Sequence, residues 1–99
     1  MKQTLNTIFL LAAVYDGRPI IPLEEIRKDY FHHLTMDGFL RKLGSGDIQL
    51  PVIRMEGSKK APKGVHLTDL ANYIDERRKE ALREFEQLSR DNRTIASII

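Results

Sequence analysis

The sequence predicts a mainly α-helical domain that carries one small β-hairpin. Apolar residues recur at helical spacing in four segments, whereas between residues 48 and 54 they alternate as in a strand. Glycine, proline and short polar residues separate these segments and supply the turns. A chain of 99 residues fits one domain, which we expect to span 1–99, with a core over about 6–88 and a tail over 89–99.

The composition narrows the classes of protein that the chain can belong to. It is 41% apolar and 30% charged, the balance of a folded, water-soluble protein. Cysteine is absent, which excludes disulfides, thiolate metal sites and cysteine nucleophiles. The longest apolar run, Ile8–Tyr15, is far shorter than the roughly 20 residues that cross a bilayer. We therefore expect a cytoplasmic protein that has no contact with a membrane.

The first helix is expected over Thr7–Tyr15, with Asn6 or Thr7 as its cap. Apolar side chains occupy its whole circumference, and not one face only. A short helix of this kind must be buried, either in the core or against a second subunit.

Two further short helices follow. The first is expected over Pro22–Tyr30, because proline suits the first helical position and acidic residues follow it. After a break over Phe31–Leu34, Thr35 can cap the next helix, and glycines at 44 and 46 end it. The residues expected on the buried face of this helix are Met36, Phe39, Leu40 and Leu43.

The next segment changes period and predicts the hairpin. Ile48, Leu50 and Val52 alternate with polar residues or proline, which indicates an extended strand that reaches Arg54. Pro51 cannot donate to a ladder and so favours an edge strand. The polar loop Gly57–Gly64 would lead into a return strand over residues 65–67.

The last helix is expected to begin after a Thr68 cap and to run to about Ser89. Its apolar stripe comprises Leu67, Leu70, Ala71, Ile74, Ala81, Leu82, Phe85 and Leu88. So long a helix exceeds what a small core can cover, so its second half should pack on the first helix or on a partner chain. We expect a homodimer, with a partner surface made by Ile8, Phe9, Leu82, Phe85 and Leu88. The segment over 91–99 is left without an assigned structure.

The position of the charges points to a nucleic-acid partner. Residues 27–63 carry eight Lys or Arg against four acids, a balance of +4, although the whole chain is only +2. Two short helices, a four-residue break and a basic hairpin together match a winged helix-turn-helix. We therefore predict a recognition helix over about 35–43 in the major groove of DNA and a basic wing over about 56–64 on the adjacent backbone. A run such as Lys59-Lys60 is also common at solvated loop tips.

The predicted DNA contacts differ in role. Arg41 could read guanine bidentately, whereas Lys42 is better suited to phosphate. Asp37 either accepts from cytosine or helps to cap the helix, and Arg54 is either a phosphate contact or a solvated strand residue. The full predicted set is Thr35, Asp37, Gly38, Arg41, Lys42, Arg54, Ser58, Lys59, Lys60 and Lys63.

A long ordered series of residues resembles the pyocin activator family. The matching strings are Asn6-Thr7, Phe9-Leu10-Leu11, Asp29-Tyr30-Phe31, Phe39-Leu40-Arg41-Lys42, Leu50-Pro51-Val52, Gly64-Val65-His66-Leu67, Asp69-Leu70-Ala71 and Tyr73-Ile74-Asp75. The likeness covers roughly residues 6–88, and the middle part is also similar to the winged helices of excisionases and MerR-type regulators. The loop tip over 57–62 and the segment beyond Arg90 depart from the family pattern.

The resemblance implies a bacterial or prophage transcription activator that binds a promoter element ahead of bacteriocin or phage genes. Such a protein would act at the nucleoid on double-stranded DNA and would also contact RNA polymerase. The alternative is a phage-encoded adaptor or antirepressor that uses its apolar helices to bind other proteins.

Other kinds of site find little support in the sequence. A zinc site built from His32-His33 with His66 or Asp29 lacks any ligand spacing typical of zinc proteins, so we expect no metal and no cofactor. His66 could instead cap the last helix or meet a phosphate. Serines and acidic residues form no pattern typical of a catalytic site, so we do not expect an enzyme.

Overall fold

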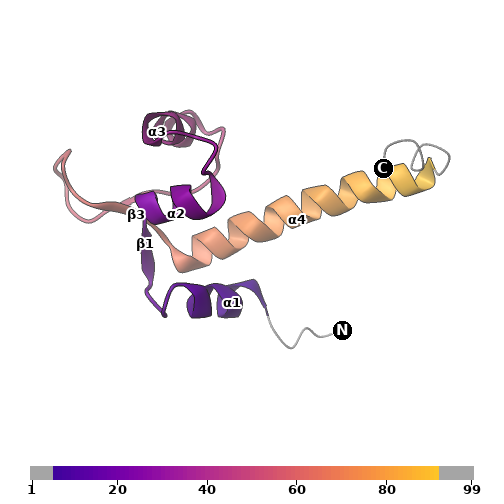
Figure 1. Cartoon of the computed structure of the whole chain (residues 1–99), viewed down its shortest axis with the longest axis horizontal. Coiled ribbons are helices and arrows are strands. Elements are labelled where there is room, and N and C mark those ends of the chain that lie inside the picture. Colours follow the sequence, from indigo (N-terminus) through magenta and orange to yellow (C-terminus); the bar gives the residue numbers. More distant parts are fainter. Residues whose placement is uncertain (1–5, 92–99) are drawn as a thin grey trace.

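The computed structural model describes residues 6–91, which form four helices and a three-stranded sheet (Figure 1). In chain order the elements are α1 (Thr7–Val14), β1 (Ile20–Pro22), α2 (Leu23–Tyr30), α3 (Met36–Ser45), β2 (Ile53–Arg54), β3 (Lys63–His66) and α4 (Leu67–Arg90). The mainly helical prediction is confirmed, and helix ends lie within one or two residues of those expected.

The sheet has one strand more than the predicted hairpin. Its order is β1-β3-β2, and both pairings are antiparallel. Ile21 of β1 lies opposite Val65, and both side chains are fully buried. The extended Ile20-Ile21 segment therefore completes the sheet, and β3 is its central strand.

The strand predicted over residues 48–54 is wrong except at its end, since β2 holds only Ile53–Arg54. The amide of Ile48 donates to the Lys42 carbonyl at the end of α3, and the Leu50 amide donates to the Ile48 carbonyl. These local bonds hold the segment as a loop. Its alternation still reflects burial, because Ile48 and Leu50 are both buried in the core.

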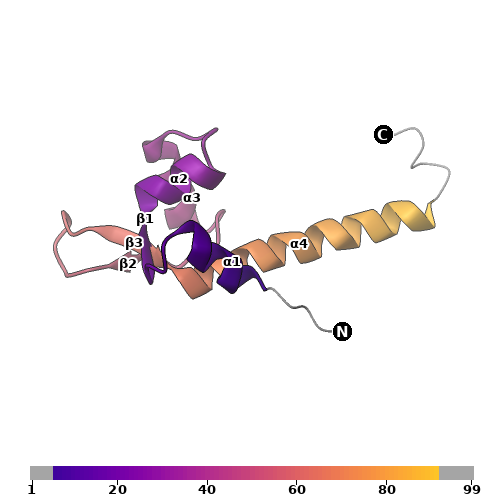
Figure 2. The ribbon, with the colours of Figure 1, turned by 60° about the horizontal axis from the view of Figure 1, so that its bottom comes forward.

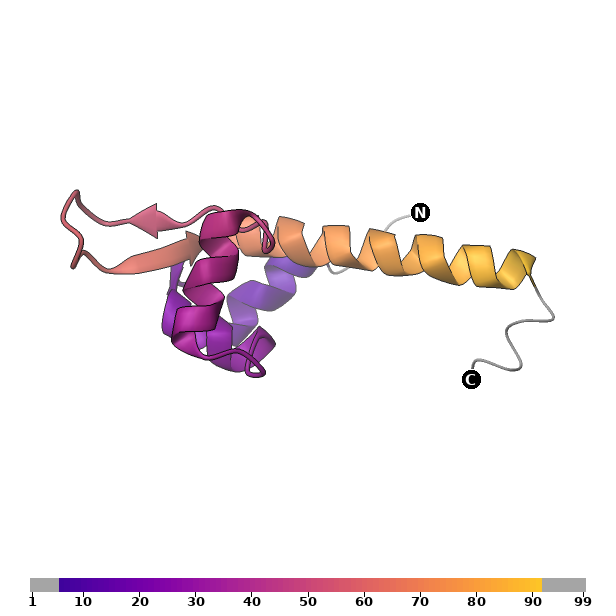
Figure 3. The ribbon, with the colours of Figure 1, turned by 90° about the horizontal axis from the view of Figure 1, so that it is seen from above.

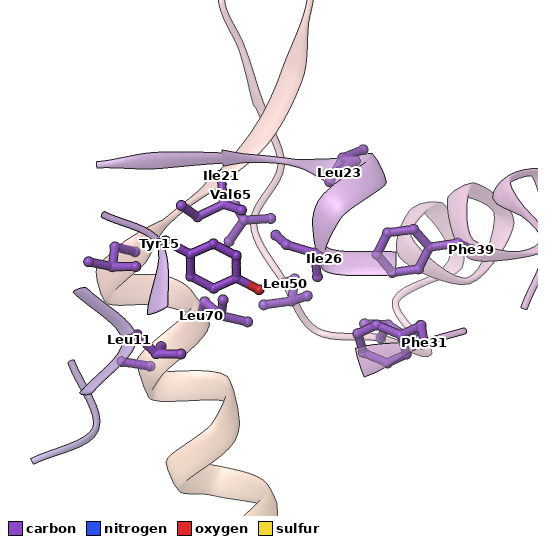
Figure 4. Packing of buried hydrophobic residues seen from close by; sticks show 13 residues of the cluster. Leu11, Tyr15, Ile21, Leu23, Ile26, Phe31, Phe39, Leu50, Val65 and Leu70 are labelled. Carbon is purple, nitrogen blue, oxygen red and sulfur yellow. The ribbon is translucent and has the colours of Figure 1, made fainter. Parts of the chain in front are cut away.

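The core lies where the helices and the sheet converge (Figure 4). Tyr15, Val65 and Leu70 pack together near the start of α4, and Phe39 extends the cluster toward α3. The Tyr15 hydroxyl donates to the Asp29 carboxylate. Burial, reinforced by that bond, raises the pKa of Tyr15 well above its usual value.

α1 lies along the first half of α4, on the side away from α3 (Figures 1 and 2). Asn6 caps α1 by accepting from the Phe9 amide, and the Thr7 hydroxyl donates to Asp75 of α4. Leu11 of α1 is buried, and its apolar side chains that remain exposed are Ile8, Phe9, Leu10 and Val14. The expectation that α1 is buried therefore holds for one face within this chain.

α4 starts directly after β3, and of the two caps considered from the sequence, Thr68 is wrong and His66 is confirmed. Nδ1 of His66 accepts from the Thr68 amide at 3.0 Å, so His66 is the cap in place of Thr68. His66 takes this role because β3 ends at His66 and α4 begins at Leu67, so the last residue of the strand is also the residue that precedes the helix. The helix then runs past the rest of the domain (Figure 3), and none of the described helices is long and apolar enough to span a membrane.

Candidate nucleic-acid interface

α3 is held at both ends and in its middle, which fixes the directions of its side chains. The Thr35 hydroxyl accepts from the Gly38 amide at 3.0 Å and caps the first turn. Phe39 is fully buried and stacks on Phe31 with ring centroids 5.0 Å apart. Gly46 ends the helix in the left-handed conformation, with φ of 86°.

Two expectations for the faces of α3 are wrong. Gly38, which as a predicted DNA contact should lie on the outer face, is buried. A Cβ added at this position would lie 3.3 Å from Thr35 Oγ1 and 3.9 Å from Arg41 Nη2. Leu40, expected to point inward, is 40% exposed, because the space beside it is an open groove. Asp37 and Arg41 are exposed, as predicted. The short distance between the Gly38 position and Arg41 Nη2 places the Arg41 guanidinium near the N-terminal turn of α3.

The β2–β3 hairpin brings two cations directly opposite each other. Its register pairs Arg54 with Lys63. Like charges at opposite positions destabilise a sheet, so this pair favours the presence of an anion. Nζ of Lys63 also donates to the Lys59 carbonyl at 3.3 Å, which ties the strand to the loop.

The loop between β2 and β3 is folded onto itself. Ala61 is buried, and its amide donates to the Ser58 carbonyl. The Ser58 hydroxyl and amide both donate to Glu56, and these bonds hold the pKa of that carboxyl below its usual value. Lys59 and Lys60 are exposed at the tip.

A groove of about 570 Å³ separates α3 from the hairpin. It is lined by Leu40, Leu43, Gly44, Leu50, Val52, Arg54 and Lys63. Figure 3 shows α3 and the hairpin side by side, with α1 behind them. Sequence reasoning identified the two cations of this groove and missed its apolar walls. The alternation of Leu50 and Val52 was the available signal, because it places both on one side of the chain.

Ion pairs show which cations serve the fold. Arg27 donates to the Leu34 carbonyl and to Glu24, and so holds α2 against the turn that follows it. Nζ of Lys42 lies 3.9 Å from Asp47. With respect to residues 6–91, the cations that form no ion pair include Arg41, Arg54, Lys59, Lys60 and Lys63.

The histidines have local roles. His66 caps α4, which is one of the two roles predicted for it, the other being a phosphate contact. The rings of His32 and His33 are perpendicular, with centroids 6.2 Å apart. Within the described part of the chain, no group of three or more histidine, aspartate or glutamate side chains is arranged to hold a metal.

The predicted partner residues lie on two helices. Ile8 and Phe9 are exposed on α1, whereas Leu82 and Phe85 are exposed on the second half of α4. Leu88, one turn beyond Phe85, is partly exposed.

The comparison with protein families gives a match for most of the chain. Residues 7–81 match the family model described as Pyocin activator protein PrtN. The matched range includes α1, the sheet, α2, α3 and the hairpin, and it ends before Leu82 of α4. Neither the curated proteins nor the solved structures gave a match.

Proposed function

The chain belongs to the pyocin activator protein family, and we propose that it activates transcription of pyocin genes by binding duplex DNA as a winged helix-turn-helix. The family supports the role of transcriptional activator. The observation that carries the DNA contact is the groove between α3 and the hairpin, where Arg54 and Lys63 flank apolar walls. In this proposal α3 is the recognition helix and the hairpin is the wing.

α3 suits the major groove of DNA. Its exposed side chains near the N-terminus include Asp37 and Arg41, and this end of a recognition helix contacts base edges. Arg41 presents a fork of donors that matches the O6 and N7 acceptors of guanine. Thr35 is committed to the cap through its hydroxyl oxygen, so its part in binding is to hold that end of the helix in place.

The wing suits the sugar–phosphate backbone. A phosphate placed between Arg54 and Lys63 would offset their mutual repulsion across the sheet. The neighbouring apolar walls, Leu40 and Val52, offer contact area for the sugars. At the tip of the same hairpin, Lys59 and Lys60 add two exposed cations that can contact phosphates.

Binding should be tested with duplexes selected from a random-sequence library, with affinity measured by fluorescence anisotropy over a series of salt concentrations. Lys59→Ala/Lys60→Ala should reduce the slope of log affinity against log salt by about 2, since each phosphate contact contributes about 0.9. Lys79→Ala/Arg83→Ala removes the same charge from α4 and should leave the slope unchanged. Failure to select any sequence, or equal slopes for the two variants, would refute this mode of binding.

Arg41→Ala distinguishes base reading from phosphate contact in the same assay. Loss of a bidentate guanine contact costs about 1–3 kcal/mol and relaxes the preference at one base position. An equal loss of affinity on all sequences would instead assign Arg41 to the backbone.

A protein-binding adaptor is the second candidate, and one observation favours it. Phe9 is 60% exposed and Val14 is 62% exposed on α1, the helix that lies on the side of α4 away from α3 (Figure 1). An activator would present such a surface to RNA polymerase, whereas an adaptor would use it without DNA. Pull-down of RNA polymerase by the wild-type chain and by Phe9→Ser, with and without selected DNA, separates the two.

A further inference from the structure

The second half of α4 carries an apolar stripe that nothing in the described chain covers. The C-terminal part of this helix extends past the rest of the domain (Figures 1 and 3). Leu82 is 40% exposed and Phe85 is 61% exposed. A helix in a protein gains most of its stability by packing its apolar face, and the apolar face of this half has no packing partner among the described residues.

The spacing of the apolar residues in the stripe is typical of a helix that packs against another helix. One line along the stripe has alternating steps of three and four residues, and Leu82 lies beside it. The members of this line are Ala71, Ile74, Arg78, Ala81, Phe85 and Leu88. This is the a/d repeat of a two-helix coiled coil. Its first members pack against the domain core, and the remainder faces solvent.

We propose that a second copy of this chain covers the stripe, with the two α4 helices antiparallel and Phe85 of each packed on the partner's Ala81. The occupant is the same chain because the stripe is self-complementary in this direction. Phe85 is large and Ala81 is small, so the antiparallel layers alternate large with small on both sides of a two-fold axis.

A parallel pair would have two defects. It would place Phe85 against the partner's Phe85 and leave a hole between the two copies of Ala81. It would also place Arg78 against the partner's Arg78 inside the seam, where like charges repel.

The charges support the same direction. In the antiparallel pair Arg78 lies level with the partner's Leu88, in the last turns of the partner's α4. The C-terminal end of a helix carries partial negative charge, which favours a cation there. On the opposite face of α4, Lys79 pairs with Glu76 and Arg83 pairs with Glu80, so the charges of that face are balanced within the chain.

The oligomeric state should be measured on the full chain by sedimentation equilibrium without DNA. The wild type should move from 11.4 kDa toward twice that mass as its concentration rises. Phe85→Ser should raise the dissociation constant by roughly tenfold or more, because two central aromatic contacts are lost. Arg83→Ser, on the opposite face, should leave it unchanged. A wild type that stays at 11.4 kDa at every concentration would overturn the proposal and assign the stripe to a different protein.

The direction of pairing can be tested by disulfide trapping, because the native sequence has no cysteine. A mixture of Arg78→Cys and Leu88→Cys chains should form the mixed disulfide, since these positions are level in the antiparallel pair. In that arrangement Leu88→Cys alone would place its two thiols about 15 Å apart along the axis, too far to bond. Efficient disulfide formation by Leu88→Cys alone would establish the parallel pair and overturn the proposed one.

These measurements do not depend on the proposed function, since DNA is absent from both. A dimer that selects no DNA sequence would refute DNA binding and leave this inference standing. A monomer that binds DNA would do the reverse.

Discussion

The two halves of α4 have the same periodicity and opposite surroundings. Leu70 and Ala71 of the first half are buried against β3, α1 and α2, whereas Phe85 of the second half is 61% exposed. Other segments of the chain pack against the first half of α4, whereas none covers Phe85 in the second half. Periodicity thus specifies which side of a helix is apolar, while the tertiary fold decides whether that side becomes core or surface.

The largest effect should come from truncating the buried half. Leu70 is 1% exposed, so Leu70→Ala should lower the free energy of unfolding by about 2–5 kcal/mol. Phe85→Ala is the matched control, and at concentrations where the chain is monomeric it should change that free energy by less than about 0.5 kcal/mol. Urea denaturation measures both. Equal losses would show that the second half is packed within one chain.

A second substitution loosens the strand that anchors the buried half. A Cβ on Gly64 would lie 2.6 Å from the carbonyl oxygen of Ile21 and 2.7 Å from Ile20 Cγ2, and the backbone there cannot give way. Gly64→Ala should therefore cost about 1–3 kcal/mol, measured by urea denaturation. Gly57→Ala is its control, because no atom of the described chain comes within 4 Å of that position. Tolerance of Gly64→Ala would mean that β1 and β3 are less closely paired.

The cap of α4 should have a smaller effect. His66→Ala removes the acceptor for the Thr68 amide and should cost about 0.5–2 kcal/mol in thermal or urea unfolding. His66→Asn keeps a side-chain acceptor and should restore most of the loss. If both variants lose the same stability, the histidine ring acts by packing and not by capping.

The smallest effect is expected for the ion pair between Arg83 and Glu80 in the exposed half. Arg83 holds the pKa of the Glu80 carboxyl below its usual value, so Arg83→Gln should raise that pKa toward the ordinary range in an NMR titration. Because the pKa is depressed in the folded chain, the pair stabilises the fold above the ordinary pKa of glutamate. That contribution disappears as the pH falls through the depressed value. Exposed pairs contribute little, so the unfolding midpoint should not move measurably.

Local patterns predicted the helices well, because their signals lie within a few residues. The Thr35 cap and the break after Tyr30 stand where the sequence placed them. Local patterns indicate that Ile20-Ile21 is extended but not which strand it pairs with. Its partner Val65 lies far along the chain, and only the fold brings the two residues together. The strand expected over residues 48–52 failed because alternation reports burial on one side, which a loop can also satisfy.

The candidate interface was predictable in its charges and not in its shape. The pairing of Arg54 with Lys63 needs the register of the hairpin, which depends on how the loop closes around Ala61. Leu40 was misplaced because helical spacing alone cannot show that the hairpin stands away from α3 and leaves a groove. The family was identified from the sequence and is confirmed by the match over residues 7–81.

The length of α4 has a consequence for any DNA that the proposed pair would occupy. The centre of the proposed seam lies between Ala81 and Phe85, 16 residues along the helix axis from Leu67, which is about 24 Å. The first residues of the two α4 helices would then lie about 48 Å apart, and each is joined to its own DNA-binding part. This distance exceeds the roughly 34 Å of one duplex turn. The number of residues in α4 would then set the distance between the two DNA half-sites that the pair can bind at once.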